Sequence, residues 1–304
     1  MPNRFTAVVC ANVFVAAMML HFALAAVQSR TAHDAKPVLK ARTKRTGPTD
    51  LEIGGDIEEL PGATGYLTRE DLLTLPQVTY TVRDDTNFKE PTRVQGVLLE
   101  HLIRALAIYP DSDLAIAICS DQYHAHYTRA YLVDHHPMLV LEVNGHAPGR
   151  WPKSTEGNNQ SMGPYMISHS EFKPGLKILA HSEEPQVPWG VVRVEFQNEK
   201  DFFDRIAPRG PNASDATVQA GYRIAQQNCL RCHNAGEVGG QKARHPWLVL
   251  SAWATASPKY FAGYVRYPQA ENPRAEMYPN PGYDDATLSA LIAYFKTFSI
   301  PEKP

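Results

Sequence analysis

The sequence predicts a multidomain protein in which an α+β or mostly β domain precedes an all-α domain. Short apolar stretches that alternate or end in turn residues recur over residues 59–198, as in sheets built from many short strands. Residues 213–300 instead carry apolar residues at helical spacing. The chain has 304 residues, enough for two ordinary domains behind an N-terminal segment.

The N-terminus has the features of an export signal. An uncharged stretch follows Arg4 as far as Ser29, and residues 23–25 fit the small-residue pattern of a cleavage site. We interpret residues 1–29 as a signal peptide or, alternatively, as a membrane anchor, because the apolar run is nearly long enough to span a bilayer. Either version predicts a periplasmic protein, soluble after cleavage or anchored to the inner membrane.

Composition and charge limit the remaining possibilities. Residues 30–58 are rich in Lys, Arg, Pro and Gly and poor in large apolar side chains, so we expect a basic linker that cannot offset its ordering entropy. The formal net charge of −2 gives no sign of nucleic-acid binding, which requires a strongly basic surface.

Within the first domain, a helix-start sequence at residues 68–71 precedes a leucine-rich turn, and residues 97–106 have the spacing of an amphipathic helix. The alternating or continuously apolar segments expected to be strands are 79–83, 115–118, 139–143, 165–167 and 190–196, with a turn at Asn144-Gly145. Residues 199–212 contain two prolines and a glycine and are expected to be a hinge. In the second domain, Ser214 or Asp215 should cap a first helix, and the last helix should run to Phe298.

The chemistry lies in the segment Cys229-Leu230-Arg231-Cys232-His233. The pattern C-x-x-C-H is the attachment motif of a c-type haem, in which the two thiols form thioethers with the vinyl groups and the histidine binds the iron. A thioredoxin-type pair would need a βαβ context, and a zinc site would need further ligands at suitable spacing. The sequence therefore predicts one covalent haem c on Cys229 and Cys232, with His233 as an axial ligand.

Residues 214–299 resemble class I cytochromes c beyond that motif. Gly221-Tyr222 lies where the family places a small residue and an aromatic residue against the last helix. The resemblance implies that a proline near Pro246 supplies a carbonyl to the proximal imidazole and that Met277 is the sixth iron ligand. Tyr278 separates Met277 from the following proline, a departure from the family pattern, and His245 is the rival ligand. The expected hydrophobic shell is Trp247, Leu248, Tyr260, Phe261, Tyr264 and Tyr267.

Residues 61–197 resemble a reduced form of the sulfite-oxidase-type molybdopterin fold. The short motifs that carry the resemblance are residues 67–72, 94–99, 119–123, 141–145 and 163–165. In catalytic members a cysteine thiolate binds molybdenum, and Cys119 lies near that position. The N-terminal segment lacks a twin-arginine pair, and the domain is small and has no clear set of arginines for a pterin phosphate. We therefore do not expect molybdopterin, and we read Cys119 as a buried apolar residue in a domain that docks a redox partner.

Four histidines form a second cluster: His124, His126, His135 and His136. The first two would share one face of a strand, which suits a metal, although polar surface or interior histidines are the commoner case.

These observations favour a non-catalytic electron carrier over an enzyme. It would take single electrons from a periplasmic dehydrogenase and pass them to a respiratory chain, through a terminal oxidase or another cytochrome. The alternatives are a molybdenum-dependent, sulfite-type dehydrogenase whose electrons leave through the haem, and a haem-based sensor with a labile sixth ligand.

Overall fold

The computed structural model describes residues 39–60, 62–83, 85–154, 160–169 and 186–299. All of them belong to one compact unit that begins at Leu39. The expected signal peptide or anchor, residues 1–29, lies outside the described residues.

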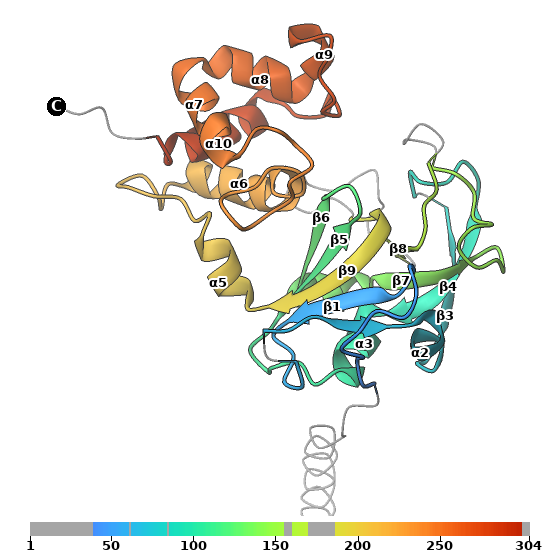
Figure 1. Cartoon of the computed structure of the whole chain (residues 1–304). Coiled ribbons are helices and arrows are strands. Elements are labelled where there is room, and N and C mark those ends of the chain that lie inside the picture. The colour runs from blue at the N-terminus through green and yellow to red at the C-terminus, as the bar shows by residue number, and fades with distance from the viewer. Residues whose placement is uncertain (1–38, 61, 84, 155–159, 170–185, 300–304) are drawn as a thin grey trace, which may run out of the picture. The chain divides into compact units, whose positions relative to one another are not determined.

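Residues 39–197 form a region dominated by one mixed β-sheet, which we call the sheet region. Its nine described strands are β1 (Leu51–Gly55), β2 (Gly65–Leu67), β3 (Val78–Val82), β4 (Thr92–Leu98), β5 (Leu114–Cys119), β6 (His124–Thr128), β7 (Met138–Val143), β8 (Tyr165–Ser168) and β9 (Trp189–Gln197). The main order is β2-β1-β9-β8-β7-β4-β3, while β5 pairs with β9 and β6 with β5 (Figure 1). The pairing of β1 with β9 is parallel, and the other pairings between these strands are antiparallel. The expectation of a mostly β or α+β fold is confirmed.

The expected linker over residues 30–58 is wrong from Leu39 onward. Residues 51–55 form β1, which joins the sheet beside β9, and Leu51, Ile53 and Ile57 are buried. The partner strand lies more than a hundred residues away in the sequence, so a pattern limited to the linker itself could not reveal the pairing.

Short helices complete the sheet region: α2 (Arg69–Leu73), α3 (Leu99–Ala105) and α4 (Arg129–His135). Thr68 and Asp71 form the capping box at the start of α2, as the helix-start sequence predicts. The expected helix over 97–106 is shorter than its apolar spacing suggests, because Val97 and Leu98 extend β4 in pairing with β7. Asn144 and Gly145 have positive φ angles of 51° and 75° and close the expected turn.

Strand β5 lies between two apolar cores. Its alternating side chains Ala115, Ala117 and Cys119 enter the core of the sheet region. Leu114 and Ile116 face the opposite way and enter a second core, which they share with the helices that follow the sheet. The two-residue repeat of a strand thus joins both regions through one element.

Residues 198–299 form the helical region, which contains α5 (Glu199–Asp204), α6 (Ala216–Ile224), the π-helical turn η1 (Ala225–Cys229), α7 (Trp247–Ala256), α8 (Pro258–Arg266), α9 (Pro268–Glu271) and α10 (Asp285–Lys296). The prediction of a hinge over residues 199–212 is wrong for residues 199–204, which form α5. Its Phe202 and Phe203 are buried in the second core. Asn198 caps α5, accepting from the Asp201 amide at 3.0 Å.

Helices α6 and α10 pack closely against one another. A side chain at Gly221 would overlap the Ala290 carbonyl and place its Cβ 2.8 Å from Cβ of Tyr294. Tyr222 stacks on Tyr294 with ring centroids 5.6 Å apart. The small-plus-aromatic pair that resembles class I cytochromes c therefore does meet the last helix.

Candidate haem-attachment site

The C-x-x-C-H motif lies at the end of a continuous helical segment. Asp215 caps α6, accepting from the Thr217 amide at 2.8 Å, and η1 continues α6 as far as Cys229. Amide groups of Cys232 and His233 then donate to the Cys229 carbonyl at 3.2 and 2.9 Å. The two cysteines therefore lie on one helical turn, neither in a disulfide and both half-buried, as addition to two vinyl groups of one porphyrin requires.

A backbone carbonyl orients the His233 ring. Nδ1 of His233 lies 2.6 Å from the carbonyl oxygen of His245. Because a carbonyl can only accept, Nδ1 carries the proton, and the lone pair on Nε2 remains available for a metal. Burial lowers the pKa of His233, and the hydrogen bond to His245 partly opposes this. Burial thus favours the neutral, ligating form of the ring.

The carbonyl belongs to His245 and not to Pro246, which corrects the expected proximal contact by one residue. The Pro246 carbonyl is engaged in the first turn of α7, where it accepts from the Val249 amide at 2.9 Å. Pro246 itself precedes the helix in an extended conformation, with φ −73° and ψ 170°. Its fixed φ directs the preceding carbonyl toward His233.

The loop that carries Met277 is tied to α8 and α9. The Met277 carbonyl accepts from Gln269 Nε2 at 2.9 Å, and the Asn280 amide donates to the Arg266 carbonyl at 3.0 Å. The Met277 side chain is partly buried against the second core, which also contains the motif residue Leu230. His245, the rival ligand, packs its ring on Trp253 with centroids 4.8 Å apart. The His245 carbonyl contacts Nδ1 of His233, so His245 lies on the side of His233, the proximal ligand.

The expected hydrophobic shell divides into three groups. Trp247 and Phe261 are buried against Phe295 of α10, with ring centroids 4.9 and 5.6 Å apart. Tyr260 and Tyr264 form a ring cluster with Trp253, at 5.5 and 5.4 Å. Leu248 and Tyr267 are 65% and 50% exposed, so the prediction that they belong to the hydrophobic shell is wrong. The two cysteine thiols, the oriented imidazole and the thioether next to an apolar core are the donor set of a haem c, so the residues fit this group.

Cys119 does not have the surroundings of a metal-binding thiolate. It ends β5 as expected and is only 2% exposed. Its side chain lies in the core of the sheet region with Tyr127, Tyr165 and Val191. Burial, followed by the charge of Asp121, raises the pKa of the thiol, whereas ligating cysteines have a lowered pKa. The residues around Cys119 therefore do not fit a molybdenum site.

The four clustered histidines separate into two pairs. His124 and His126 share one face of β6, with ring centroids 6.3 Å apart, and His126 packs on Phe202 at 5.3 Å. His135 packs instead on Tyr131 at 4.7 Å, and His136 pairs with Glu100 at 3.1 Å. Within the described ranges, no three His, Cys, Asp or Glu side chains are arranged to hold a metal ion.

The β5–β6 turn docks directly on the haem motif, a contact that the sequence does not predict. The His124 amide donates to the Arg231 carbonyl at 2.9 Å, and the Gln241 amide donates to the Gln122 carbonyl at 3.0 Å. Lys242 forms an ion pair with Asp121 at 2.7 Å. We call this contact the hairpin–motif interface; it joins residues 119–124 to residues 230–231 and 239–242.

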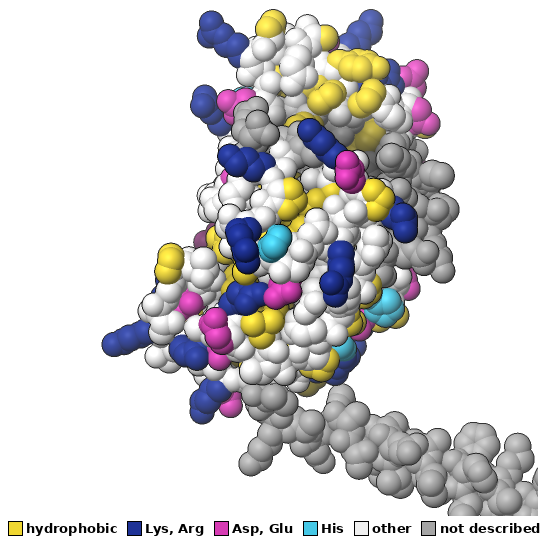
Figure 2. Space-filling model, turned by 90° about the vertical axis from the view of Figure 1, so that its right-hand side faces the viewer, with side chains coloured by type: hydrophobic (Ala, Val, Ile, Leu, Met, Phe, Trp, Pro, Cys, Tyr) yellow, Lys and Arg dark blue, Asp and Glu magenta, His cyan; other side chains and the backbone are white. Residues whose placement is uncertain are grey.

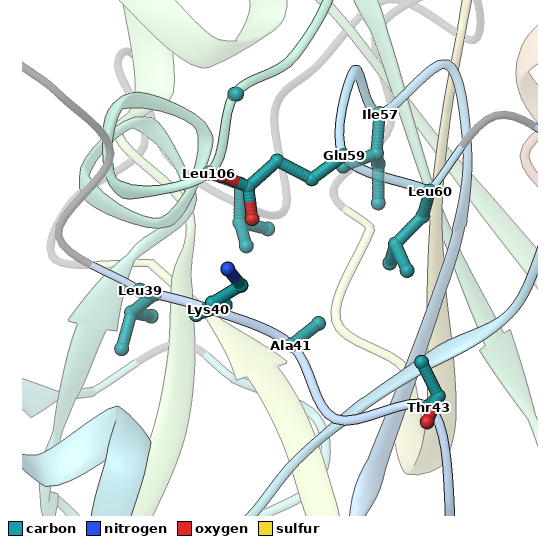
Figure 3. A pocket seen from close by; sticks show the side chains of 9 residues that line it. Leu39, Lys40, Ala41, Thr43, Ile57, Glu59, Leu60 and Leu106 are labelled. Atoms are coloured by element: carbon teal, nitrogen blue, oxygen red, sulfur yellow. The ribbon is translucent and has the colours of Figure 1, made fainter.

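Two further features of the described residues are a surface of mixed charge and a small cavity. Figure 2 shows Lys and Arg side chains scattered among acidic and hydrophobic ones on one face. A cavity of about 100 Å³ lies in the sheet region, where the side-chain ends of Lys40 and Glu59 point toward one another (Figure 3). Its walls are Leu39, Lys40, Ala41, Thr43, Ile57, Glu59, Leu60, Leu106 and Ala107, none of which is an expected site residue. No helix in the described part of the chain is long and apolar enough to cross a bilayer.

A match to a protein-family model agrees with this interpretation of the helical region. Residues 216–295 match the family model for cytochrome c oxidase, cbb3-type, subunit III. Curated protein sequences give no match. Among solved structures, sulfane dehydrogenase SoxCD from Paracoccus pantotrophus is similar at 16% identity, with a TM-score of 0.34. That match covers 56% of this chain and 45% of the other, so less than half of the SoxCD chain is represented here. The C-x-x-C-H turn, its oriented histidine and the family match together show that the C-terminal region of this chain is a cytochrome c domain.

Proposed function

We propose that this chain is an exported monohaem c-type cytochrome that carries single electrons from a periplasmic dehydrogenase to a respiratory chain. The observation that supports this most strongly is the 2.6 Å contact from His233 Nδ1 to the His245 carbonyl. It leaves Nε2 available as an iron ligand next to two cysteines that form no disulfide and lie on the same turn.

Each residue of the site has one task in this proposal. Cys229 and Cys232 would hold the porphyrin covalently, and His233 and Met277 would be the side chains that bind its iron. The bound haem would supply reversible one-electron chemistry at the iron. Iron held by both of these side chains would have no position open for oxygen, which would favour outer-sphere electron transfer over oxygen chemistry.

The sheet region acts in this proposal as a non-catalytic partner of the cytochrome domain. Cys119 faces an apolar core and its thiol is held protonated by burial. The hairpin–motif interface gives the sheet region a structural role at the haem motif instead. Export and a periplasmic location follow from the apolar N-terminal segment, and fractionation of cells expressing the full chain tests them.

Metal analysis distinguishes an electron carrier from the alternative, a molybdenum-dependent dehydrogenase. It uses the full-length protein, made in a host that attaches haem c. We expect one iron per chain, no stoichiometric molybdenum, and a redox titration that fits a single one-electron step. Stoichiometric molybdenum that is lost in Cys119→Ala, together with reduction of the haem by sulfite, would contradict the proposal and establish the dehydrogenase alternative. Met277→Ala serves as the matched variant, because it should alter the haem spectrum without changing the iron content.

A further inference from the structure

We propose that Tyr283 is a positioning residue for the iron ligand Met277, because its hydrogen bond with Asn228 holds the loop that carries Met277 next to the attachment turn. This inference rests on the proposed function, since it requires covalent haem and a Met277 thioether that binds its iron. It goes further by giving a task to Tyr283 and Asn228, to which the sequence assigns none. We call residues 272–284, between α9 and α10, the Met277 loop.

One side-chain contact joins the Met277 loop directly to the helical segment that ends in the attachment turn. Asn228 Nδ2 donates to the hydroxyl oxygen of Tyr283 at 2.6 Å. Asn228 lies in η1, next to Cys229, and 55 positions of the sequence separate it from Tyr283. The contact therefore fixes the end of the loop beside the first haem cysteine.

Tyr283 is buried where the loop and the attachment turn meet. Its side chain is 4% exposed and lies in the second core together with Leu230 of the motif. Cys229 and Met277 pack against the same core as partly buried side chains. Loss of a hydrogen bond between buried groups costs more than loss of an exposed one. The burial of Tyr283 therefore strengthens the hold of this contact on the loop.

Hydrogen bonds within the loop connect Tyr283 to Met277. The Tyr283 amide donates to the Asn280 carbonyl at 3.1 Å. Asn280 Nδ2 in turn donates at 3.3 Å to the carbonyl of Tyr278, the neighbour of Met277. Gln269 Nε2 donates to the Met277 carbonyl itself at 2.9 Å. A displacement of Tyr283 would therefore act on the backbone that carries the methionine.

Helix α8 holds the same part of the loop through backbone carbonyl groups. Arg266 Nε donates to the Tyr283 carbonyl at 2.9 Å, and Asn280 Nδ2 donates to the Val265 carbonyl at 2.9 Å. Tyr283 thus has its carbonyl on α8 and its hydroxyl on η1. This places Tyr283 between the loop and the segment that binds the porphyrin.

A loop held in this way opposes release of the methionine from the iron. Added imidazole can bind at that position only in molecules whose thioether has moved away, so its apparent affinity depends on the fraction of such molecules. A hydrogen bond that exists only while the loop is in place lowers this fraction by about fivefold. Contacts behind the ligands orient and tune metal sites in proteins in the same manner.

The test is an imidazole titration of the ferric full-length holoprotein, followed by the sulfur-to-iron absorption band. Tyr283→Phe removes the hydroxyl and keeps the ring, so imidazole should bind about fivefold more tightly. Asn228→Ala removes the other partner and should act in the same direction. Because both changes break one contact, the double variant should bind imidazole no more tightly than the tighter-binding single variant.

Two other tyrosines separate positioning from stability. Tyr222 donates to the Phe203 carbonyl at 3.0 Å, far from the loop in the sequence. Tyr222→Phe should therefore lower the free energy of unfolding and leave imidazole binding unchanged, as expected of a purely structural residue. Tyr278→Phe alters a side chain of the Met277 loop that is 60% exposed and should change neither quantity.

Asn228→Ala keeps the inference testable if Tyr283→Phe fails to fold, as judged by haem content and circular dichroism. It breaks the same contact from the other side and leaves the buried tyrosine ring in place. Imidazole should again bind more tightly than to the parent protein, and an unchanged affinity would contradict the inference.

Three results would overturn the inference. They are an unchanged imidazole affinity in Tyr283→Phe, an equal gain of affinity in Tyr222→Phe, or additive effects of Tyr283→Phe and Asn228→Ala in the double variant. Absence of covalent haem from the parent protein, or a sulfur-to-iron band that survives in Met277→Ala, is a different result. Either one would refute the proposed function or its iron ligand, not the role of Tyr283 alone.

Discussion

The substitution Gly221→Ala tests the packing that defines the cytochrome domain. The added methyl group would overlap the Ala290 carbonyl and lie 2.8 Å from Cβ of Tyr294, whereas carbon atoms pack best at about 3.5–4.0 Å. Helices α6 and α10 would have to separate by at least roughly 0.7 Å. Overpacking of this kind costs about 1–3 kcal/mol, and the upper end applies because backbone atoms cannot rotate away.

Replacing a helical glycine by alanine also brings a gain of about 1 kcal/mol in helix propensity. We therefore expect the free energy of unfolding of Gly221→Ala to fall by about 2 kcal/mol. Urea unfolding of the holoprotein, followed by haem absorbance and by far-ultraviolet circular dichroism, measures this difference.

Gly263→Ala in α8 is the matched control. There the added methyl group meets the end of the Glu271 side chain, which is exposed and free to move. This variant should be as stable as the parent or more stable by up to about 1 kcal/mol. Equal stability of Gly221→Ala and Gly263→Ala would refute the argument that close α6–α10 contact requires glycine.

Three further predictions concern the iron ligand, a buried histidine and the contact with α5. Met277→Ala should abolish the sulfur-to-iron absorption band and lower the midpoint potential, and an unchanged spectrum would remove Met277 from the site. Burial, with His135 adding to it, lowers the pKa of His169 to about 3. Below about pH 6.5, His169 therefore binds a proton in the unfolded chain but not in the folded chain. The free energy of unfolding should consequently fall as pH drops below about 6.5. Between pH 8 and pH 5, His169 should lower the free energy of unfolding by about 2 kcal/mol. Urea titrations of His169→Gln should lack this loss, and the same pH dependence in parent and variant would contradict the prediction. Tyr222 donates to the Phe203 carbonyl at 3.0 Å, so Tyr222→Phe should cost about 1 kcal/mol, while Tyr278→Phe, at a side chain 60% exposed, should cost nothing measurable.

Local patterns predicted the elements whose causes are local. The Asp215 cap, the capping box at Thr68 and the Asn144-Gly145 turn depend on residues within a few positions of one another. The attachment turn is equally local, since one helical turn brings Cys229, Cys232 and His233 together.

Long-range contacts explain what the sequence did not reveal. Strand β1 pairs with β9, which comes from the far end of the sheet region in the sequence. The segment predicted to be a hinge contains helix α5, whose Phe202 and Phe203 are buried in the second core. The His245 carbonyl orients His233, because the Pro246 carbonyl accepts a hydrogen bond in the first turn of α7. The docking of residues 119–124 on the haem motif likewise depends on the tertiary fold.

The sheet region and the cytochrome domain share one core, and this affects how variants are interpreted. Leu114 and Ile116 of β5 lie in the same cluster as Leu230 of the motif. A destabilising change on that face of β5 should therefore also affect the haem spectrum. Changes at Ala115 or Ala117, on the opposite face of the strand, should act on the sheet region first.

Intact-mass analysis of the purified full-length protein, produced in a host with haem-attachment machinery, tests the central claim most directly. We predict a coloured protein whose mass exceeds that of its polypeptide by one haem, and loss of the covalent haem in the double variant Cys229→Ala, Cys232→Ala. A colourless product at the mass of the bare polypeptide would contradict the assignment of Cys229, Cys232 and His233 as a haem-attachment site.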